Sequence, residues 1–381
     1  MPSPFAFATA TEILFGRGQA AAAPARVAAL GRRALLVQGG NATRADWLAG
    51  ALMGAGCEVT RFSARAEPDL PLIEAGLAVA RGCDVVVALG GGAVIDTGKA
   101  LAALVPARRP VMDHLEVVGQ GLALDHAPLP FVAIPTTAGT GAEVTRNAVI
   151  GVPDHARKVS LRDPRMLPRL AIVDPALTDG CPRAVTLASG LDAITQVIEP
   201  YVSTRANALT DALCRDAIPR GLAAIRRLMA AEDAARDEMA WVSLCGGLAL
   251  ANSGLGVVHG LAGPLGGLTG AAHGAICGAL LPHALVANRQ AVTDAGHAAR
   301  LDEVAGWIGA AFGAPGVSVG QAAGLLAGWS RDAGLPGLTA QGVDAAAQQA
   351  AAEMAAASSS MKANPAALTP EALVALMGEA G

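Results

Sequence analysis

The 381-residue sequence is poor in charged and aromatic side chains, and both deficits restrict the class of protein it can form. Charged residues make up 16% and aromatic residues 3%, whereas hydrophobic residues reach 52%, which argues against long disordered stretches. The net charge is −4 and no Lys/Arg-rich run occurs, so we expect no nucleic-acid partner. Because Ala and Gly supply much of the apolar content, the composition favours closely packed helices over a core of large rings.

Signals for export, for membrane insertion and for paired cysteines are also lacking. The chain begins Met1-Pro-Ser-Pro without a basic segment followed by an apolar one, so we expect no signal peptide. Apolar runs such as 248–258 are interrupted by Asn252, Ser253 and glycines, so we expect no membrane span. The six cysteines form no Cys-x-x-Cys pair. They are typical of buried thiols in a reducing compartment, which predicts a cytoplasmic protein without a zinc–thiolate cluster.

The length allows two domains, each with its own core. The first part alternates β-rich runs with helical patterns, which predicts a Rossmann-like α/β domain with a parallel sheet over residues 1–182. The expected strands are 34–37, 58–62, 84–89, 131–134 and 170–173, with helices at 45–54 and 71–81 and a hairpin formed by 145–152 and 157–161.

Beyond Pro182 the strand-like runs disappear, and Ala/Leu-rich helical segments continue to the C-terminus. This change predicts an all-α domain over residues 183–381. Because proline interrupts helices, we expect helix breaks at Pro219, Pro264, Pro282, Pro315 and Pro336.

A run of three glycines follows the expected strand 84–89. Gly90, Gly91 and Gly92 precede Ala93-Val-Ile-Asp96-Thr-Gly-Lys99, which is a good start for a helix. Glycines let the backbone approach a pyrophosphate, and the free N–H groups of a helix N-terminus point at it. The pattern favours a nucleotide site, with a tight turn without a ligand as the alternative. It is not the usual Gly-x-Gly-x-x-Gly fingerprint.

Two further loops are candidates for contact with the same cofactor. The segment from Gly39 to Asn41 ends the first expected strand, where an acidic residue usually selects NAD by binding the ribose. Here no acidic residue is present and Arg44 is close, so NADP is an alternative to NAD. The hydroxyls of Thr136, Thr137 and Thr140 suit a cofactor-lining loop, although a simple turn would explain that segment equally well.

Four polar residues in the helical part suggest a site for a divalent metal. Asp192 and Gln196 share one helix face because they stand four residues apart, and His259 and His273 follow in a Gly-rich region. Two imidazoles and a carboxylate form a common catalytic set for Zn²⁺ or Fe²⁺. The alternative is that each histidine is a hydrogen-bonded interior residue and Asp192 caps a helix.

These motifs together resemble the iron-containing (group III) alcohol dehydrogenase family of the dehydroquinate-synthase-like superfamily, over nearly the full length. The matching segments are Gly90-Gly-Gly-Ala-Val-Ile-Asp-Thr-Gly-Lys99, Pro135-Thr-Thr-Ala-Gly-Thr-Gly-Ala-Glu143, Ala188-Ser-Gly-Leu-Asp-Ala193, His259-Gly-Leu-Ala-Gly-Pro-Leu-Gly266 and Ala272-His-Gly274. The resemblance implies a nucleotide-binding α/β domain, a helical domain, a cleft between them and a homodimer or higher homo-oligomer. It also implies an NAD or NADP cofactor, a divalent metal and a small alcohol or aldehyde substrate.

The resemblance also implies roles for individual residues. Gly90, Gly91, Gly92 and Ala93 would hold the pyrophosphate, and the three threonines would line the cofactor. Lys158 would lie near the nicotinamide and Asp96 would face it, with His273 as a further catalytic candidate. Asp192, Gln196, His259 and His273 would bind the metal.

This chain departs from the family pattern at three positions. Gln196 stands where the family usually has a histidine ligand, and an amide oxygen is a weaker donor than imidazole. Gly263 stands where many members carry a second histidine, and Gly39 where many carry the NAD-selecting aspartate.

The sequence therefore predicts a metal-assisted alcohol/aldehyde oxidoreductase that uses NAD(P). Two alternatives stay open at this point. One is a metal-independent keto-acid reductase similar to the maleylacetate reductases of the same superfamily. The other is a non-catalytic relative that only binds nucleotide.

Overall fold

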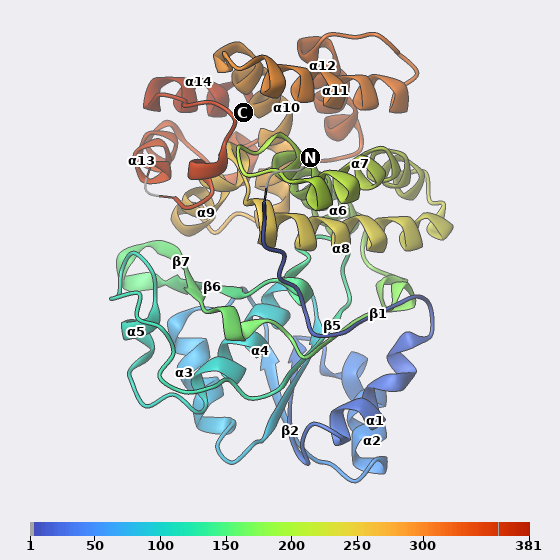
Figure 1. Cartoon of the computed structure of the whole chain (residues 1–381), viewed down its shortest axis with the longest axis vertical. Coiled ribbons are helices and arrows are strands. Elements are labelled where there is room, and N and C mark those ends of the chain that lie inside the picture. Colours follow the sequence, from blue (N-terminus) through green and yellow to red (C-terminus); the bar gives the residue numbers. More distant parts are fainter. Residues whose placement is uncertain (1–3, 357) are drawn as a thin grey trace. The chain divides into compact units, whose positions relative to one another are not determined.

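The computed structural model describes residues 4–356 and 358–381. The chain forms two compact units, which are described separately below (Figure 1). An α/β unit comprises residues 9–137 and 141–179, and a helical unit comprises residues 4–8 and 138–140 and the described part of 180–381.

The α/β unit is built on a six-stranded sheet in which every strand pair is parallel. The strand order is β1-β8-β5-β4-β2-β3. The strands are β1 (Ile13–Phe15), β2 (Arg33–Gly39), β3 (Glu58–Ala64), β4 (Val85–Gly90), β5 (Phe131–Pro135) and β8 (Leu170–Val173). All five predicted strands are present, and β1 is an additional strand that the sequence did not predict.

Both faces of the sheet are covered, which explains why its strands are almost wholly apolar. Leu35 and Val37 of β2 pack on the side of α3 (Leu70–Val79) and α4 (Gly92–Leu104). Leu36, between them, packs on the opposite side with α1 (Ala23–Ala28) and α2 (Asp46–Gly54) (Figure 1). The predicted doubly covered parallel sheet is confirmed.

The predicted hairpin is also present. Strands β6 (Asn147–Val152) and β7 (Arg157–Arg162) pair antiparallel and form a separate two-stranded sheet. Ile150 and Leu161 turn their side chains into the core on the α4 side of the main sheet. A short helix, α5 (Val111–His114), lies in the connection that leads to β5.

The helical unit has one continuous core, to which all its longer helices contribute. These helices are α6 (Arg183–Val202), α7 (Ala208–Met229), α8 (Arg236–Ser253), α9 (Val257–Thr269), α10 (His273–Ala291), α11 (Ala295–Ala311), α12 (Val319–Asp332), α13 (Ala345–Ala355) and α14 (Pro370–Glu379). The predicted helical C-terminal part is confirmed.

The prediction of helix breaks was wrong at Pro219, Pro264 and Pro282, which lie inside α7, α9 and α10. A proline in a helix interior loses one hydrogen bond and costs about 3 kcal/mol. Burial of neighbours on both sides, such as Leu261 and Leu265 around Pro264, offsets that cost.

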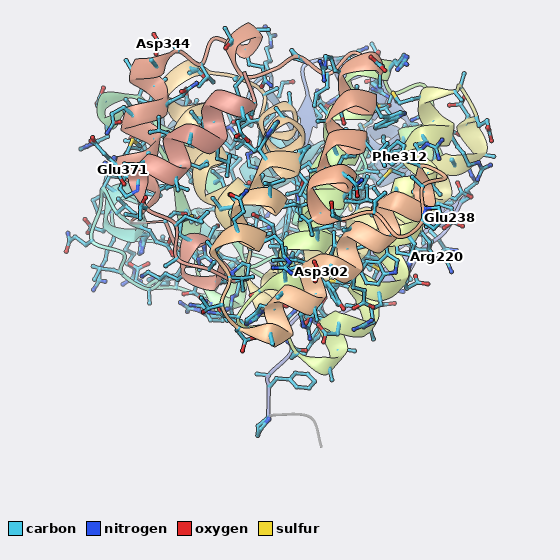
Figure 2. All side chains as sticks on the ribbon, turned by 90° about the horizontal axis from the view of Figure 1, so that it is seen from above. Arg220, Glu238, Asp302, Phe312, Asp344 and Glu371 are labelled. Carbon is cyan, nitrogen blue, oxygen red and sulfur yellow. The ribbon has the colours of Figure 1, made fainter. Side chains whose placement is uncertain are left out.

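Many charged side chains lie on the outside of the helical unit. Asp302, Asp344 and Glu371, which are labelled in Figure 2, are exposed, and Arg220 forms an ion pair with Glu238 at 3.0 Å. Among the described residues no single helix is long and apolar enough to cross a membrane. Asp233–Ser253 and Val257–Thr269 pass by length and composition only as a pair bent by 100°.

Candidate active site

One face of α6 carries three buried polar side chains in the helical unit. Asp192, Gln196 and Glu199 are spaced four and three residues apart, which places them along one stripe of the helix. Their exposed fractions are 2%, 2% and 5%. Buried polar groups need partners, so this stripe must meet polar or cationic groups from another element.

The first turn of α9 supplies one such group, His259. Its Nδ1 lies 2.6 Å from Glu199 Oε2, and the backbone N–H of Val258 donates to Glu199 Oε1 at 2.7 Å. The N–H of Val257 donates to Asn364 Oδ1 at 3.0 Å. Glu199 and Asn364 thus occupy the free N–H groups at the start of α9 and fix the direction of the His259 ring.

The first turn of α10 supplies His273 and Cys277, which share a helix face because they are four residues apart. A Cβ atom at Gly274 would lie 2.6 Å from the carbonyl oxygen of Ala188 on α6. The absence of that atom lets α10 lie against α6, which brings the two side chains up to Asp192.

The four side chains converge on one point. His259 Nε2 lies 3.3 Å and His273 Nε2 lies 3.8 Å from Asp192 Oδ1. Cys277 Sγ lies 3.9 Å from His259 Nε2 and 3.6 Å from His273 Nε2. One ligand atom from each residue falls within 4.8 Å of all the others.

The electrostatics of this cluster are those of a site that attracts positive charge. Burial opposes ionisation of Asp192, but the His273 and His259 imidazoles outweigh it and lower its pKa to about 2. Burial also opposes protonation of the imidazoles. The negative groups around them outweigh it, so the pKa of His273 rises to about 9 and that of His259 rises well above its ordinary value.

These residues fit a divalent metal. Asp192 Oδ1 is buried and has no hydrogen-bond partner among the described residues, although two imidazole nitrogens face it. Carboxylate, imidazole and thiolate are all zinc ligands, and the first two also suit iron. The exposed fraction of the His273 side chain is 34%, so the cluster is open on that side.

Gln196 lies against the same carboxylate. Its side chain hydrogen bonds to Asp192 and contributes to lowering the aspartate pKa, after the larger effects of burial and the two histidines. Its Oε1 is buried and lacks a hydrogen-bond partner in the described part of the chain.

In the α/β unit, the predicted cofactor residues gather where neighbouring strands end. Register aligns Gly90, the last residue of β4, with Pro135 at the end of β5, and Thr136 N–H donates to Gly90 O at 2.9 Å. Gly91 precedes α4, and a Cβ atom there would lie 3.3 Å from Thr137 Oγ1. The glycine turn, the loop residues Thr136 and Thr137, and the N-terminus of α4, with Gly92 and Ala93, therefore share one edge.

The end of β2 lies at the same edge, because Gln38 pairs with Leu89. A Cβ atom at Gly39 would lie 3.9 Å from Val94 on α4. Asn41 begins the next helical turn, and its Oδ1 accepts hydrogen bonds from the N–H and hydroxyl of Thr43. This is the edge of a parallel sheet at which nucleotides bind.

Three other predicted residues have contacts of a different kind. Asp96 Oδ2 accepts from Val149 N–H at 3.0 Å, and its other oxygen lies 3.9 Å from Lys99 Nζ, so this carboxylate ties α4 to β6. Lys158 on β7 pairs with Glu67. Thr140 falls in segment 138–140, which belongs to the helical unit.

Sequence reasoning missed Cys277, which is one of the four residues of the cluster, and Glu199, which contacts His259. Both carried a signal: Cys277 is four residues after His273, and Glu199 is seven residues after Asp192. The sequence analysis considered cysteines only in Cys-x-x-Cys pairs and therefore overlooked a thiol that lies beside two histidines. All six cysteines are free, and the other five lie outside the cluster.

The chain thus combines an α/β unit, in which the predicted cofactor residues lie at one sheet edge, with a helical unit that holds the polar cluster. Comparison with known proteins shows which family has this combination. A family model for iron-containing alcohol dehydrogenase matches residues 10–175. The model for the C-terminal part of the Fe-containing alcohol dehydrogenase family matches residues 186–381. The chain belongs to the iron-containing alcohol dehydrogenase family.

Named relatives and solved structures agree with this assignment. The chain is 39% identical to the lactaldehyde reductase of Escherichia coli K12 over 221 residues, which is 57% of each chain. It is 38% identical to the 1,3-propanediol dehydrogenase of Klebsiella pneumoniae over 252 residues, or 64% of each chain. The alignments thus span less than two thirds of these relatives.

The structural matches extend over the whole chain. A crystal structure of a 1,3-propanediol oxidoreductase covers 100% of both chains with a TM-score of 0.87 and 31% identity. The iron-containing alcohol dehydrogenase from Thermococcus thioreducens covers 98% of this chain and 99% of its own, with a TM-score of 0.86 and 26% identity.

Proposed function

We propose that the protein is an NAD(P)-dependent, metal-assisted oxidoreductase that interconverts a small alcohol and its carbonyl compound. In the oxidative direction the alcohol carbon gives a hydride to the nicotinamide and the hydroxyl gives a proton to water. The products are an aldehyde or ketone, NAD(P)H and a proton. Family membership and the names of the relatives support this reaction class.

One observation carries the metal part of the proposal: the buried Asp192 Oδ1 lacks a hydrogen-bond partner among the described residues while His259 and His273 face it. Asp192, His259 and His273 would hold Zn²⁺ or Fe²⁺, which supplies a Lewis acid for the substrate oxygen. The chain's own contribution is to fix the donor atoms. Glu199 orients His259, and burial of Asp192 keeps water from its carboxylate.

The cofactor part of the proposal depends on the strand-end edge of the α/β unit. The backbone N–H groups at the start of α4 would bind the pyrophosphate, because the first N–H groups of a helix have no partner within the helix. No carboxylate stands at position 39 to select NAD. A Cβ atom at Gly40 would contact Arg65 at 3.6 Å, so the aliphatic part of the Arg65 side chain lies beside this turn. An arginine near this position would pair with the 2′-phosphate of NADP, which makes NADP a second candidate cofactor.

The test is the variant His259→Ala, assayed for metal content and turnover. The variant is expected to lose bound metal and NAD(P)H-dependent reduction of aldehydes together. The control is His283→Ala, since His283 lies outside the cluster and contacts Glu379 at 3.4 Å. If metal-free His259→Ala still reduced aldehydes, the proposed role of the metal in turnover would be wrong. Chelator-insensitive reduction of keto-acids would support the metal-independent alternative instead.

A further inference from the structure

The position of Cys277 in the cluster agrees with a ligand bond. Tetrahedral zinc with a bond of about 2.3 Å to sulfur and about 2.0–2.1 Å to nitrogen and oxygen places S about 3.6 Å from N, and N about 3.4 Å from O. The distances from Cys277 Sγ to the two Nε2 atoms are 3.6 and 3.9 Å. Those from Asp192 Oδ1 to the same atoms are 3.3 and 3.8 Å. Each distance is within about 0.5 Å of the one the metal requires.

A second observation, the contact of His259 with both Glu199 and Asp192, also agrees with a metal ion between these atoms. His259 Nδ1 is occupied by Glu199, so Nε2 is the ring nitrogen that faces Asp192 Oδ1 and the one that a neutral, metal-bound ring would offer as a ligand. That oxygen is buried and has no hydrogen-bond partner in the part of the chain that the structure describes. A carboxylate oxygen and an imidazole nitrogen that face each other in a buried site need a positive charge between them, which a proton supplies in the metal-free protein and a bound metal ion would supply in its place.

The chain also lacks the imidazole that usually completes this set. Position 196 carries Gln, whose amide is a neutral oxygen donor hydrogen bonded to Asp192. Cys277 lies one turn after His273 on α10, and its sulfur joins the cluster from that helix, whereas Gln196 lies on α6. A thiolate is a stronger ligand for zinc than an amide oxygen.

We propose that the Cys277 thiolate is the fourth protein ligand, which makes this an Asp–His–His–Cys site that retains zinc in preference to iron. The inference rests on the proposed metal site. It adds a ligand, Cys277, that does not belong to the ligand pattern of Asp192, Gln196, His259 and His273 predicted from the sequence. Gln196 then acts as a positioning residue for Asp192 and not as a ligand. Asp192 and Cys277 together carry two negative charges, which balance a divalent ion.

Cobalt substitution of the full-length protein tests this inference directly. A sulfur–cobalt bond gives a charge-transfer absorption band in the near ultraviolet, which oxygen and nitrogen ligands do not give. The wild-type protein loaded with Co²⁺ is expected to show the band, and Cys277→Ser is expected to lose it. Cys214→Ala is the matched control, because Cys214 is an equally buried thiol of the helical unit outside the cluster. It is expected to keep the band.

The affinity for zinc gives a second readout that does not depend on turnover. Cys277→Ser is expected to bind Zn²⁺ about 100-fold more weakly, and Gln196→Ala less than about tenfold. X-ray absorption of the zinc protein is expected to show one sulfur neighbour at about 2.3 Å. Circular dichroism of each metal-free variant checks that its fold is retained.

Two results would overturn the inference in distinguishable ways. A stoichiometric metal without a sulfur band, or a loss of zinc in Gln196→Ala but not in Cys277→Ser, removes Cys277 from the ligand set and leaves the proposed function standing. A wild-type protein that binds neither Zn²⁺, Fe²⁺ nor Co²⁺ overturns both. The preference for zinc is tested by offering Zn²⁺ and Fe²⁺ together to each protein. If Cys277→Ser binds the two metals in the same ratio as the wild type, Cys277 is not the source of a preference for zinc.

Discussion

Glu199 Oε2 lies 2.6 Å from His259 Nδ1, and the other oxygen of the same carboxylate accepts the N–H of Val258. One side chain of α6 therefore fixes both the ring of a candidate ligand and the end of the helix that carries it. A carboxylate behind a ligand histidine sets the ring's tautomer and increases its basicity, which strengthens the metal bond.

The variant Glu199→Gln is expected to weaken metal binding about 10–100-fold, because the amide replaces the charge that supports His259. The measurement is zinc affinity by competition with a chromogenic chelator. Glu379→Gln is the control, since Glu379 lies beside His283 with its side chain 67% exposed. An affinity equal to that of the wild type would show that Glu199 serves only to cap α9.

The variant Gly39→Asp is expected to shift cofactor preference toward NAD. A carboxylate at the end of β2 would hydrogen bond the ribose hydroxyls and repel a 2′-phosphate. The site has room, because a Cβ atom at this position meets Val94 at an ordinary 3.9 Å. The measurement is the ratio of kcat/KM for NADH to that for NADPH, expected to rise at least about tenfold, or about 1.4 kcal/mol. A ratio that stays constant would place the ribose elsewhere.

The sequence predicted most of the α/β unit because its strands are apolar runs between turn residues, and such runs fold as buried parallel strands. It missed β1, since the three residues Ile13–Phe15 are too short to show a period. It also misjudged the prolines of the helical unit, because the burial that stabilises α9 and α10 around Pro264 and Pro282 is a tertiary effect.

For the site, spacing brought Asp192 and Gln196 onto one face but could not show which residues meet them. Convergence depends on how closely helices approach, and here that is decided by details such as the bare Cα of Gly274 against Ala188. Cys277 and Glu199 enter the cluster through this packing. Neither is evident until α6, α9 and α10 are placed together.

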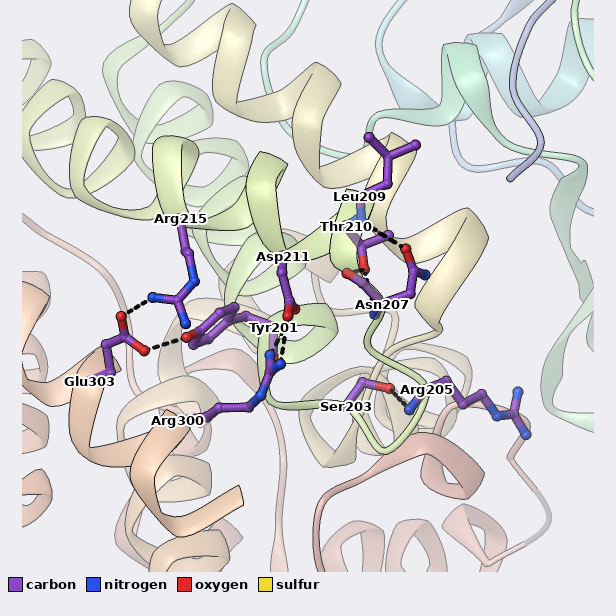
Figure 3. Close-up of polar contacts among 10 residues, drawn as sticks. All are labelled: Tyr201, Ser203, Arg205, Asn207, Leu209, Thr210, Asp211, Arg215, Arg300 and Glu303. Carbon is purple, nitrogen blue, oxygen red and sulfur yellow. Dashed lines mark hydrogen bonds and ion pairs between the residues drawn. The ribbon is translucent and has the colours of Figure 1, made fainter. Parts of the chain in front are cut away.

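Hydrogen bonds and ion pairs around Arg300 and Tyr201 stabilise the C-terminal end of α6 (Figure 3). The Arg300 guanidinium donates to the Tyr201 carbonyl oxygen and to both oxygens of Asp211, and it lies 4.8 Å from the centre of the Tyr201 ring. Tyr201 is fully buried, and its hydroxyl donates to Glu303.

The variant Arg300→Ala is therefore expected to destabilise the protein by about 2–3 kcal/mol, since it leaves a partly buried carboxylate and a carbonyl unpaired. Arg289→Ala is the control: Arg289 also pairs with an aspartate, Asp302, but the two side chains are 41% and 54% exposed. It should change stability by less than about 0.5 kcal/mol. Urea unfolding measures both, and equal effects would contradict a special role for the network.

The lowered pKa of Asp163 predicts that the free energy of unfolding decreases in acid. Hydrogen bonds from Arg165 outweigh burial and lower the pKa of Asp163 to about 2, below the value of 3.8 for a free carboxyl. The stabilisation is complete above pH 3.8 and is lost as the pH falls toward 2. Asp163→Asn should cost about 1–2 kcal/mol at pH 7, allowing for solvent screening of Arg165, and the difference from wild type should shrink between about pH 4 and 2. A difference that is constant with pH would mean that packing alone is responsible.

Two glycines near the cluster are expected to respond to the same substitution in opposite ways. A Cβ atom at Gly263, inside α9, meets no described atom within 4 Å, whereas one at Gly274 would lie 2.6 Å from Ala188 O. Gly263→Ala should therefore stabilise the protein by about 0.5–1 kcal/mol through lower chain entropy, with metal binding unchanged. Gly274→Ala should destabilise it by about 1–3 kcal/mol and weaken zinc binding, because α10 must move away from α6 with His273 and Cys277. Thermal unfolding with and without zinc separates the two effects. If Gly274→Ala lowered stability but left zinc affinity intact, the close approach of the helices would not be what assembles the cluster.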